Sequence, residues 1–147
     1  MAFTNPYAAY QNTAVKTASQ GKLVVMLYET AVKQLAAAIK CFDEKTGKVP
    51  ANMIESYSNH IMKTQEIINE LQVSLDMDKG GQIAQNLMSL YVYFNRELMD
   101  ANINKDKEKL TFVQNMMAQL LDAWESASNS AANAPAANVR PTLNIRG

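Results

Sequence analysis

Four long stretches of this 147-residue chain carry an apolar residue at every third or fourth position, and this spacing limits the fold more than any other feature. A mean spacing of about 3.5 residues places the apolar side chains on one face of an α-helix. No stretch sustains the period of two that a strand requires. The expected helices cover 19–44, 50–75, 81–101 and 105–127. Seams of this kind are typical of helices packed in a left-handed bundle.

The expected core consists of the residues that repeat along these four seams. They are Val24, Tyr28, Ala31, Leu35, Ala38 and Phe42; Ile54, Tyr57, Ile61, Thr64, Ile68, Leu71 and Leu75; Leu87, Tyr91, Phe94, Leu98 and Ala101; and Leu110, Val113, Met117, Leu120, Trp124 and Ala127. Each set lies on one side of its helix, so the four sets can be buried against one another.

The breaks between the helices are short. Gly47 and Pro50 mark the first, the glycine pair at 80–81 marks the second, and the Asn-Ile-Asn sequence at 102–104 marks the third. Short connections force consecutive helices to run antiparallel. The sequence therefore predicts an all-α fold, an antiparallel up-down-up-down four-helix bundle over 19–128.

Two terminal segments fall outside the seams. Residues 1–18 contain Phe3, Tyr7 and Tyr10 but no acidic residue. Aromatic side chains seldom stay fully solvated, so we expect an N-terminal arm that packs on the bundle. Residues 129–147 are rich in Asn, Ala and Pro, and we expect them to form a flexible, disordered tail.

Charge and cysteine content exclude several classes of protein. Lysine plus arginine and aspartate plus glutamate number 14 each, so the net charge is zero, and the excess of positive charge needed for nucleic acid is missing. The apolar run at 23–28 is too short for a signal peptide or a membrane span. Cys41 is the single cysteine, so no internal disulfide can form. We expect a cytoplasmic protein without direct membrane insertion.

The inventory of catalytic residues is small. His60 is the single histidine, and a di-iron bundle would need two Glu-x-x-His pairs. We therefore expect no enzyme activity, no metal and no cofactor, with His60 at the rim of the bundle. The alternative is a bundle that binds haem, or another cofactor, non-covalently through His60. Visible absorption that is lost in His60→Ala would support that alternative.

The chain has nine methionines, more than a small bundle needs. Met26, Met88, Met99 and Met116 lie off the strict seams. Two interpretations remain open. These side chains can fill gaps in the core, or they can form an adaptable surface that accepts an amphipathic helix from a partner.

Several short strings, in this order, resemble the flagellin-specific export chaperones of the FliS family. They are NPYAAY at 5–10, TAS at 17–19, LVVMLYE at 23–29, SLDMDKGG at 74–81, IAQNL at 83–87, LY at 90–91 and ANI at 101–103. The resemblance covers residues 3–127. One departure follows Ser19, where family members often carry Pro and Glu but this chain has Gln20, Gly21 and Lys22.

The resemblance implies a helical bundle with a defined role. Such chaperones bind the C-terminal helical region of newly made flagellin, keep it from polymerising early, and present it to the cytoplasmic domain of the flagellar type III export gate. The flagellin-binding groove it implies consists of Met26, Leu27, Tyr28, Leu90 and Tyr91. The N-terminal arm that covers this surface and docks to the gate consists of Asn5, Pro6, Tyr7 and Tyr10. Whether the free chain forms a homodimer is left open.

Overall fold

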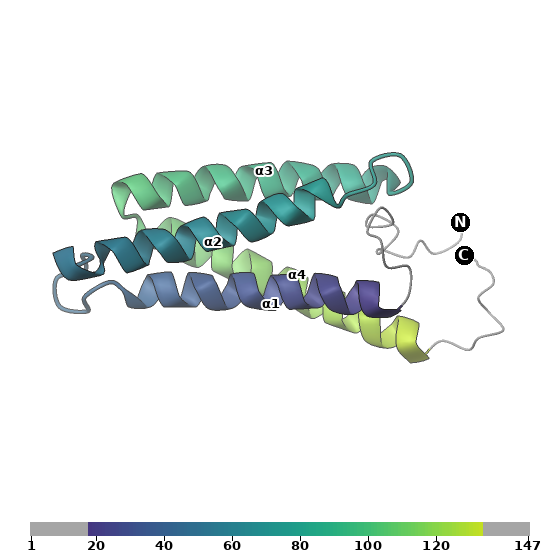
Figure 1. The fold of residues 1–147 in the computed structure, drawn as a ribbon, viewed down its shortest axis with the longest axis horizontal. Helices are drawn as coiled ribbons and strands as arrows, with labels where there is room; N and C mark the ends of the chain where they lie inside the picture. The colour runs from purple at the N-terminus through teal and green to yellow at the C-terminus, as the bar shows by residue number, and fades with distance from the viewer. Residues whose placement is uncertain (1–17, 134–147) are drawn as a thin grey trace.

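Four long helices make up the computed structural model, which describes residues 18–133 (Figure 1). They are α1 (Ala18–Lys40), α2 (Ile54–Val73), α3 (Gly81–Asn104) and α4 (Lys107–Asn133), and a short 3₁₀ turn, η2 (Ala51–Met53), precedes α2. The described residues contain no strand. The predicted all-α four-helix fold is confirmed.

Each helix packs on two neighbours. α1 contacts α2 and α4, and α3 contacts the same two helices, so α1 and α3 lie diagonally across the bundle. The small side chains of Ala31 and Ala38 are fully buried on α1 and let α2 and α4 approach it closely. Because α1 and α3 are diagonal, the α1–α2 and α3–α4 interfaces lie on opposite sides of the bundle.

Figure 1 shows that α1 and α2 separate toward the end where α1 begins and α2 ends.

The first two helices are shorter than predicted, and at the end of α1 a side chain of the connection binds backbone groups. α1 stops at Lys40 rather than at residue 44, and the Asp43 carboxylate accepts hydrogen bonds from the N–H groups of Lys45 and Thr46 at 2.7 and 3.0 Å. This turn satisfies donors that a longer helix would have used. After η2, α2 begins at Ile54 and ends at Val73, inside the predicted range 50–75.

The second and third connections are also set by local chemistry. Asp76 accepts hydrogen bonds from the N–H groups of Asp78 and Lys79, and Gly81 opens α3 with a φ of 57°. α3 continues through the predicted break at 102–104 and stops at Lys105, which takes the left-handed conformation. Asp106 then accepts from Glu108 and Lys109, which is the arrangement of a helix N-cap.

The predicted boundary of the C-terminal tail was wrong by five residues. α4 runs to Asn133, so residues 129–133 are helical rather than part of a disordered tail. The rest of that tail, 134–147, and the N-terminal arm with Asn5, Pro6, Tyr7 and Tyr10 lie outside the described residues.

The core agrees closely with the predicted seams. Leu35, Tyr57 and Phe94 are fully buried, as are most other seam residues. Ile54 is an exception with 43% of its surface exposed, because it is the first residue of α2 at the end of the bundle. Leu120 is only partly buried. No helix within 18–133 is long and apolar enough to cross a membrane.

Candidate functional site

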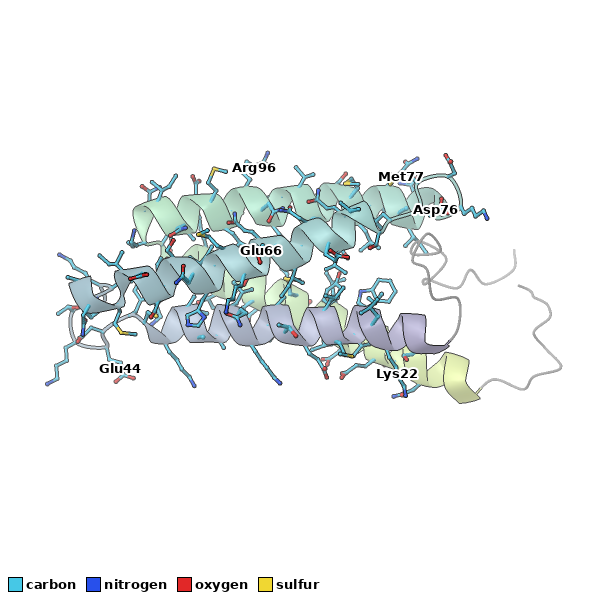
Figure 2. All side chains as sticks on the ribbon, viewed as in Figure 1. Lys22, Glu44, Glu66, Asp76, Met77 and Arg96 are labelled. Carbon is cyan, nitrogen blue, oxygen red and sulfur yellow. The ribbon has the colours of Figure 1, made fainter. Side chains whose placement is uncertain are left out.

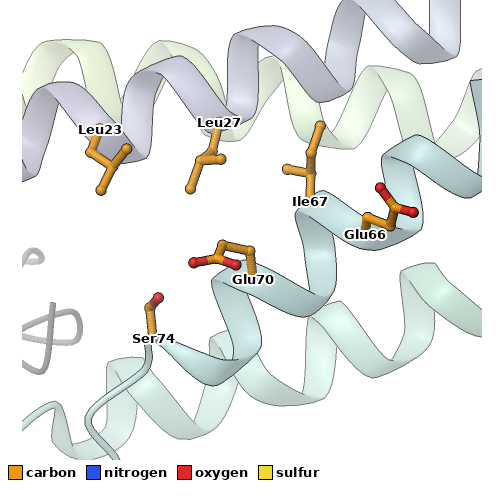
Figure 3. A pocket seen from close by; sticks show the side chains of 6 residues that line it. All are labelled: Leu23, Leu27, Glu66, Ile67, Glu70 and Ser74. Atoms are coloured by element: carbon orange, nitrogen blue, oxygen red, sulfur yellow. The ribbon is translucent and has the colours of Figure 1, made fainter.

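A cleft of about 290 Å³ lies between α1 and α2, at the end where these helices separate. Its lining residues come from the start of α1, the second half of α2 and the residue that follows α2: Leu23, Leu27, Glu66, Ile67, Glu70 and Ser74. In Figure 3 the two leucines point from α1 toward α2, and Ile67 points back toward α1. We name this feature the α1–α2 cleft.

The walls of the α1–α2 cleft are apolar and partly open to solvent. Leu23 is 39% exposed, whereas Leu27 and Ile67 are half-buried against the core. Met26 is 58% exposed and follows Leu23 by three positions, so it extends the same flank of α1 outward. A flexible thioether beside branched side chains can adapt to the shape of an apolar ligand.

A second apolar surface, the α3–α4 strip, lies on the opposite side of the bundle. It consists of Leu90 and Tyr93 on α3, and of Phe112, Met116 and Leu120 on α4. The rings of Tyr93 and Phe112 meet edge-to-face with centroids 6.2 Å apart, which fixes the facing flanks of the two helices. Leu90 precedes Tyr93 by three positions and therefore lies on that α4-facing flank.

The interface between α2 and α3 is polar by contrast. The side-chain amide of Asn95 donates to Asn69 at 3.0 Å and to Gln72 at 3.2 Å. The Gln65 side-chain amide donates to the main-chain carbonyl oxygen of Asn95 at 3.3 Å. Farther along, Asn102 donates to Ser58. These hydrogen bonds link α2 to α3, although the side-chain oxygen of Asn95 is buried without a partner. The half-open apolar surfaces described above lie at other edges of the bundle.

Two of the residues assigned to the groove from the sequence are in the core. Tyr28 and Tyr91 are both fully buried, and their hydroxyl oxygens lie 2.6 Å apart across the diagonal between α1 and α3. The ring of Tyr28 also packs 6.2 Å from that of Trp124. We therefore correct the assignment of these two tyrosines to the binding groove. Both belong to the core and offer no exposed area to a partner.

The buried Tyr28 hydroxyl leads to a prediction about alkaline stability. Burial raises the pKa of Tyr28 from 10.0 to about 12, although hydrogen bonds with Tyr91 and Trp124 lower it. A raised folded-state pKa gives stability that is complete below pH 10 and is lost as the pH rises toward 12. At pH 11 this loss is about 1.4 kcal/mol. Urea unfolding at pH 9 and 11 should show a smaller drop in Tyr28→Phe than in the unmodified protein, and equal drops would contradict the assignment.

Comparison with known proteins identifies the family. A family model described as "Flagellar protein FliS" matches residues 3–131, which is most of the chain. The chain belongs to the FliS family. This membership supports a chaperone role in flagellar export, and the word chaperone is part of the name of each relative below.

Three FliS relatives show how far the similarity extends. The chain is 32% identical over 130 residues to the flagellar secretion chaperone FliS of Bacillus subtilis, covering 88% of this chain and 91% of that protein. It is 34% identical over 119 residues to the protein of the same name from Salmonella typhimurium, with 81% and 84% covered. The Campylobacter jejuni protein is 30% identical over 124 residues, with 84% and 91% covered.

The groove residues predicted from the FliS resemblance do not meet in one groove. Leu27 lines the α1–α2 cleft, Met26 is exposed on α1 outside the lining of the cleft, and Leu90 lies on the α4-facing flank of α3. The prediction missed Glu66 and Glu70 of the cleft, although two acidic residues four positions apart around Ile67 were visible in the sequence. The geometry thus offers two apolar surfaces, one of them with acidic residues.

His60 has a structural role in this FliS-family bundle. Its Nδ1 atom lies 2.7 Å from the Gln34 amide oxygen, which links α2 to α1. Within the described residues, no group of three or more His, Cys, Asp or Glu side chains could hold a metal ion. Nothing in this geometry favours the haem alternative.

Of the four off-seam methionines, Met26 and Met99 are each 58% exposed, while Met88 and Met116 pack partly against the core. The packing of Met88 and Met116 is consistent with gap filling, and a partner-binding role for the exposed methionines stays a prediction.

Proposed function

We propose that this chain is a cytoplasmic export chaperone that binds the C-terminal helical segment of flagellin. Binding keeps flagellin from polymerising early and delivers it to the cytoplasmic domain of the flagellar type III export gate. The observation that carries the proposal is FliS-family membership together with two half-open apolar surfaces on opposite sides of one bundle. No catalysis, nucleotide or cofactor takes part.

The physical basis is the burial of apolar stripes. Helices of flagellin that are buried only in the filament expose their apolar faces in the free chain, and an amphipathic helix can place such a face in an apolar groove. The α1–α2 cleft and the α3–α4 strip can each contact the apolar face of one such flagellin helix. Ordering a segment on binding costs several kcal/mol, so the apolar contact must be wide.

We extend the proposal to the N-terminal arm. By family resemblance, Asn5, Pro6, Tyr7 and Tyr10 cover part of the apolar surface in the free chain and then take part in docking to the export gate. A homodimer of the free chain would cover the same surfaces in another way, so the free protein is either monomeric with the arm in place or dimeric through its apolar faces.

Calorimetric titration with flagellin purified from the same organism tests the proposal. We expect one flagellin per chain, no requirement for nucleotide, and a negative heat-capacity change, because the contact removes apolar surface from water. A flagellin lacking its C-terminal helical segment is the matched control and should give no binding heat. Equal binding of the truncated and complete flagellins would contradict the proposed mode of recognition.

A further inference from the structure

The α1–α2 cleft differs from the α3–α4 strip in its charge. Besides its apolar walls, the cleft is lined by Glu66 and Glu70, which lie four positions apart on α2 and are both exposed. In Figure 3 the Glu70 carboxylate extends from α2 into the space below Leu27 and Leu23. A ligand seated on these leucines therefore lies next to at least one carboxylate.

Neither glutamate forms an ion pair within the described part of the chain. Both ion pairs found between residues 18 and 133 involve Lys109, which contacts Glu97 and Asp100 at the far side of α3. Like charges four positions apart on a helix repel each other and destabilise it by a few tenths of a kcal/mol. Lys63 lies three positions before Glu66 on α2, but no cation lies three or four positions from Glu70. Glu70 therefore places a negative charge without a helical neighbour of opposite sign beside an apolar cleft.

A purely apolar ligand fits this cleft poorly. It would remove water from the carboxylates without replacing the lost hydrogen bonds, which carries a free-energy cost. Lysine and arginine combine an aliphatic stem, which can lie on apolar surface, with a charged head that stays near water. That combination matches the apolar walls and the acidic flank of the cleft.

We propose that the α1–α2 cleft is a subsite for a lysine or arginine side chain on the edge of the bound helix. The aliphatic stem lies against Leu23, Leu27 and Ile67, and the cationic head lies beside the Glu70 carboxylate, with Glu66 one helical turn away at the edge of the cleft. The inference rests on the proposed function, because it names the chemistry of the segment that such a chaperone recognises. In this proposal the α1–α2 cleft selects a cationic side chain of the bound helix, and the α3–α4 strip provides the wide apolar contact.

The charges around the α3–α4 strip agree with these separate roles for the cleft and the strip. The cations beside it already have partners: Lys109 pairs with Asp100 at 2.8 Å, and the Arg96 guanidinium lies 5.9 Å from the centre of the Tyr93 ring. The strip residues themselves carry no charge. The α3–α4 strip therefore presents an apolar surface, and no charged residue belongs to it that could select a charged side chain of the bound helix.

The experiment measures binding of purified flagellin from the same organism to the full chain at low and high salt. The test variant is Glu66→Gln/Glu70→Gln. Its control is Glu44→Gln/Glu55→Gln, which removes the same charge from exposed positions near the 41–53 connection. Figure 2 shows Glu44 at the end of the bundle away from Asp76 and the end of α2.

We expect the test variant to bind about tenfold more weakly at low salt and equally at high salt, because salt screens exposed charges. The control variant should bind within twofold of the unmodified protein at both salt concentrations. The thermal midpoint of the test variant should stay equal or rise, because the repulsion is relieved, so a loss of binding would not reflect unfolding.

Three results would overturn the inference. If the test variant binds normally while Leu90→Asp does not, the chaperone function stands but the cleft does not select a cation. If the test variant binds more tightly, the glutamates hold a basic segment of the chain itself, such as that around Arg140 and Arg146, rather than the cargo. If the unmodified protein fails to bind flagellin, the proposed function fails, and the subsite inference fails with it.

Discussion

Leu90→Asp is expected to weaken flagellin binding at least tenfold, or about 1.4 kcal/mol, while the protein stays helical. Leu90 is half-buried on the α4-facing flank of α3, where a bound helix would cover it. An introduced carboxylate would have to lose water beside Tyr93 and Met116 without gaining a partner. Calorimetry gives the change in affinity, and circular dichroism gives the helix content.

Asn115→Asp is the matched control, because it introduces the same charge at an exposed position of α4. It should change the affinity by less than twofold. Lys109 would be a poor control position, since its ammonium group is 2.8 Å from Asp100 and its replacement would leave that carboxylate unpaired. Normal binding by Leu90→Asp, together with a steep salt dependence of the unmodified protein, would contradict an apolar mechanism.

Phe94→Ala is expected to lower the free energy of unfolding by about 3–5 kcal/mol, the range for removing a large aromatic side chain from a core. Phe94 is fully buried at the centre of α3. Folded domains are stable by only about 5–15 kcal/mol, so the variant should unfold at much lower urea concentration. Val92→Ala, two residues away and 47% exposed, should change the stability by about 0.5 kcal/mol or less. Similar losses at the two positions would show that α3 faces the core differently.

The buried helix faces were predictable because burial on one side of a helix requires apolar residues at every third or fourth position of the sequence. Ile61, Thr64 and Ile68 follow one another at three and four positions, and each is fully buried. The helix ends were less predictable. They depend on short-range hydrogen bonds from Asp43 and Asp106, whose side chains compete with helical backbone bonds only in the local geometry of each connection.

The candidate site was harder to predict from the sequence than the core. Leu27 and Tyr28 are neighbours in one apolar run, yet successive residues on a helix point about 100° apart. The position of the neighbouring helices decides that Tyr28 is buried and Leu27 lines the cleft. Leu90 and Tyr91 repeat the same relation on α3. The resemblance drew attention to the segments around Leu27 and Leu90, and only their packing in the fold separates surface residues from core residues.

The close packing of the first helix on the last one has a consequence for biosynthesis. Tyr28 and Trp124 stack together although 95 residues separate them in the sequence, and α1 also packs on α2. During translation α1 and α2 can pair early, but the partner that completes the core around α1 leaves the ribosome only with the last quarter of the chain. Contacts between distant parts of the chain slow folding. The part of the α1 apolar face that packs on α4 therefore stays uncovered until α4 has been made, so this chaperone passes through a stage in which it exposes an apolar helix face of its own.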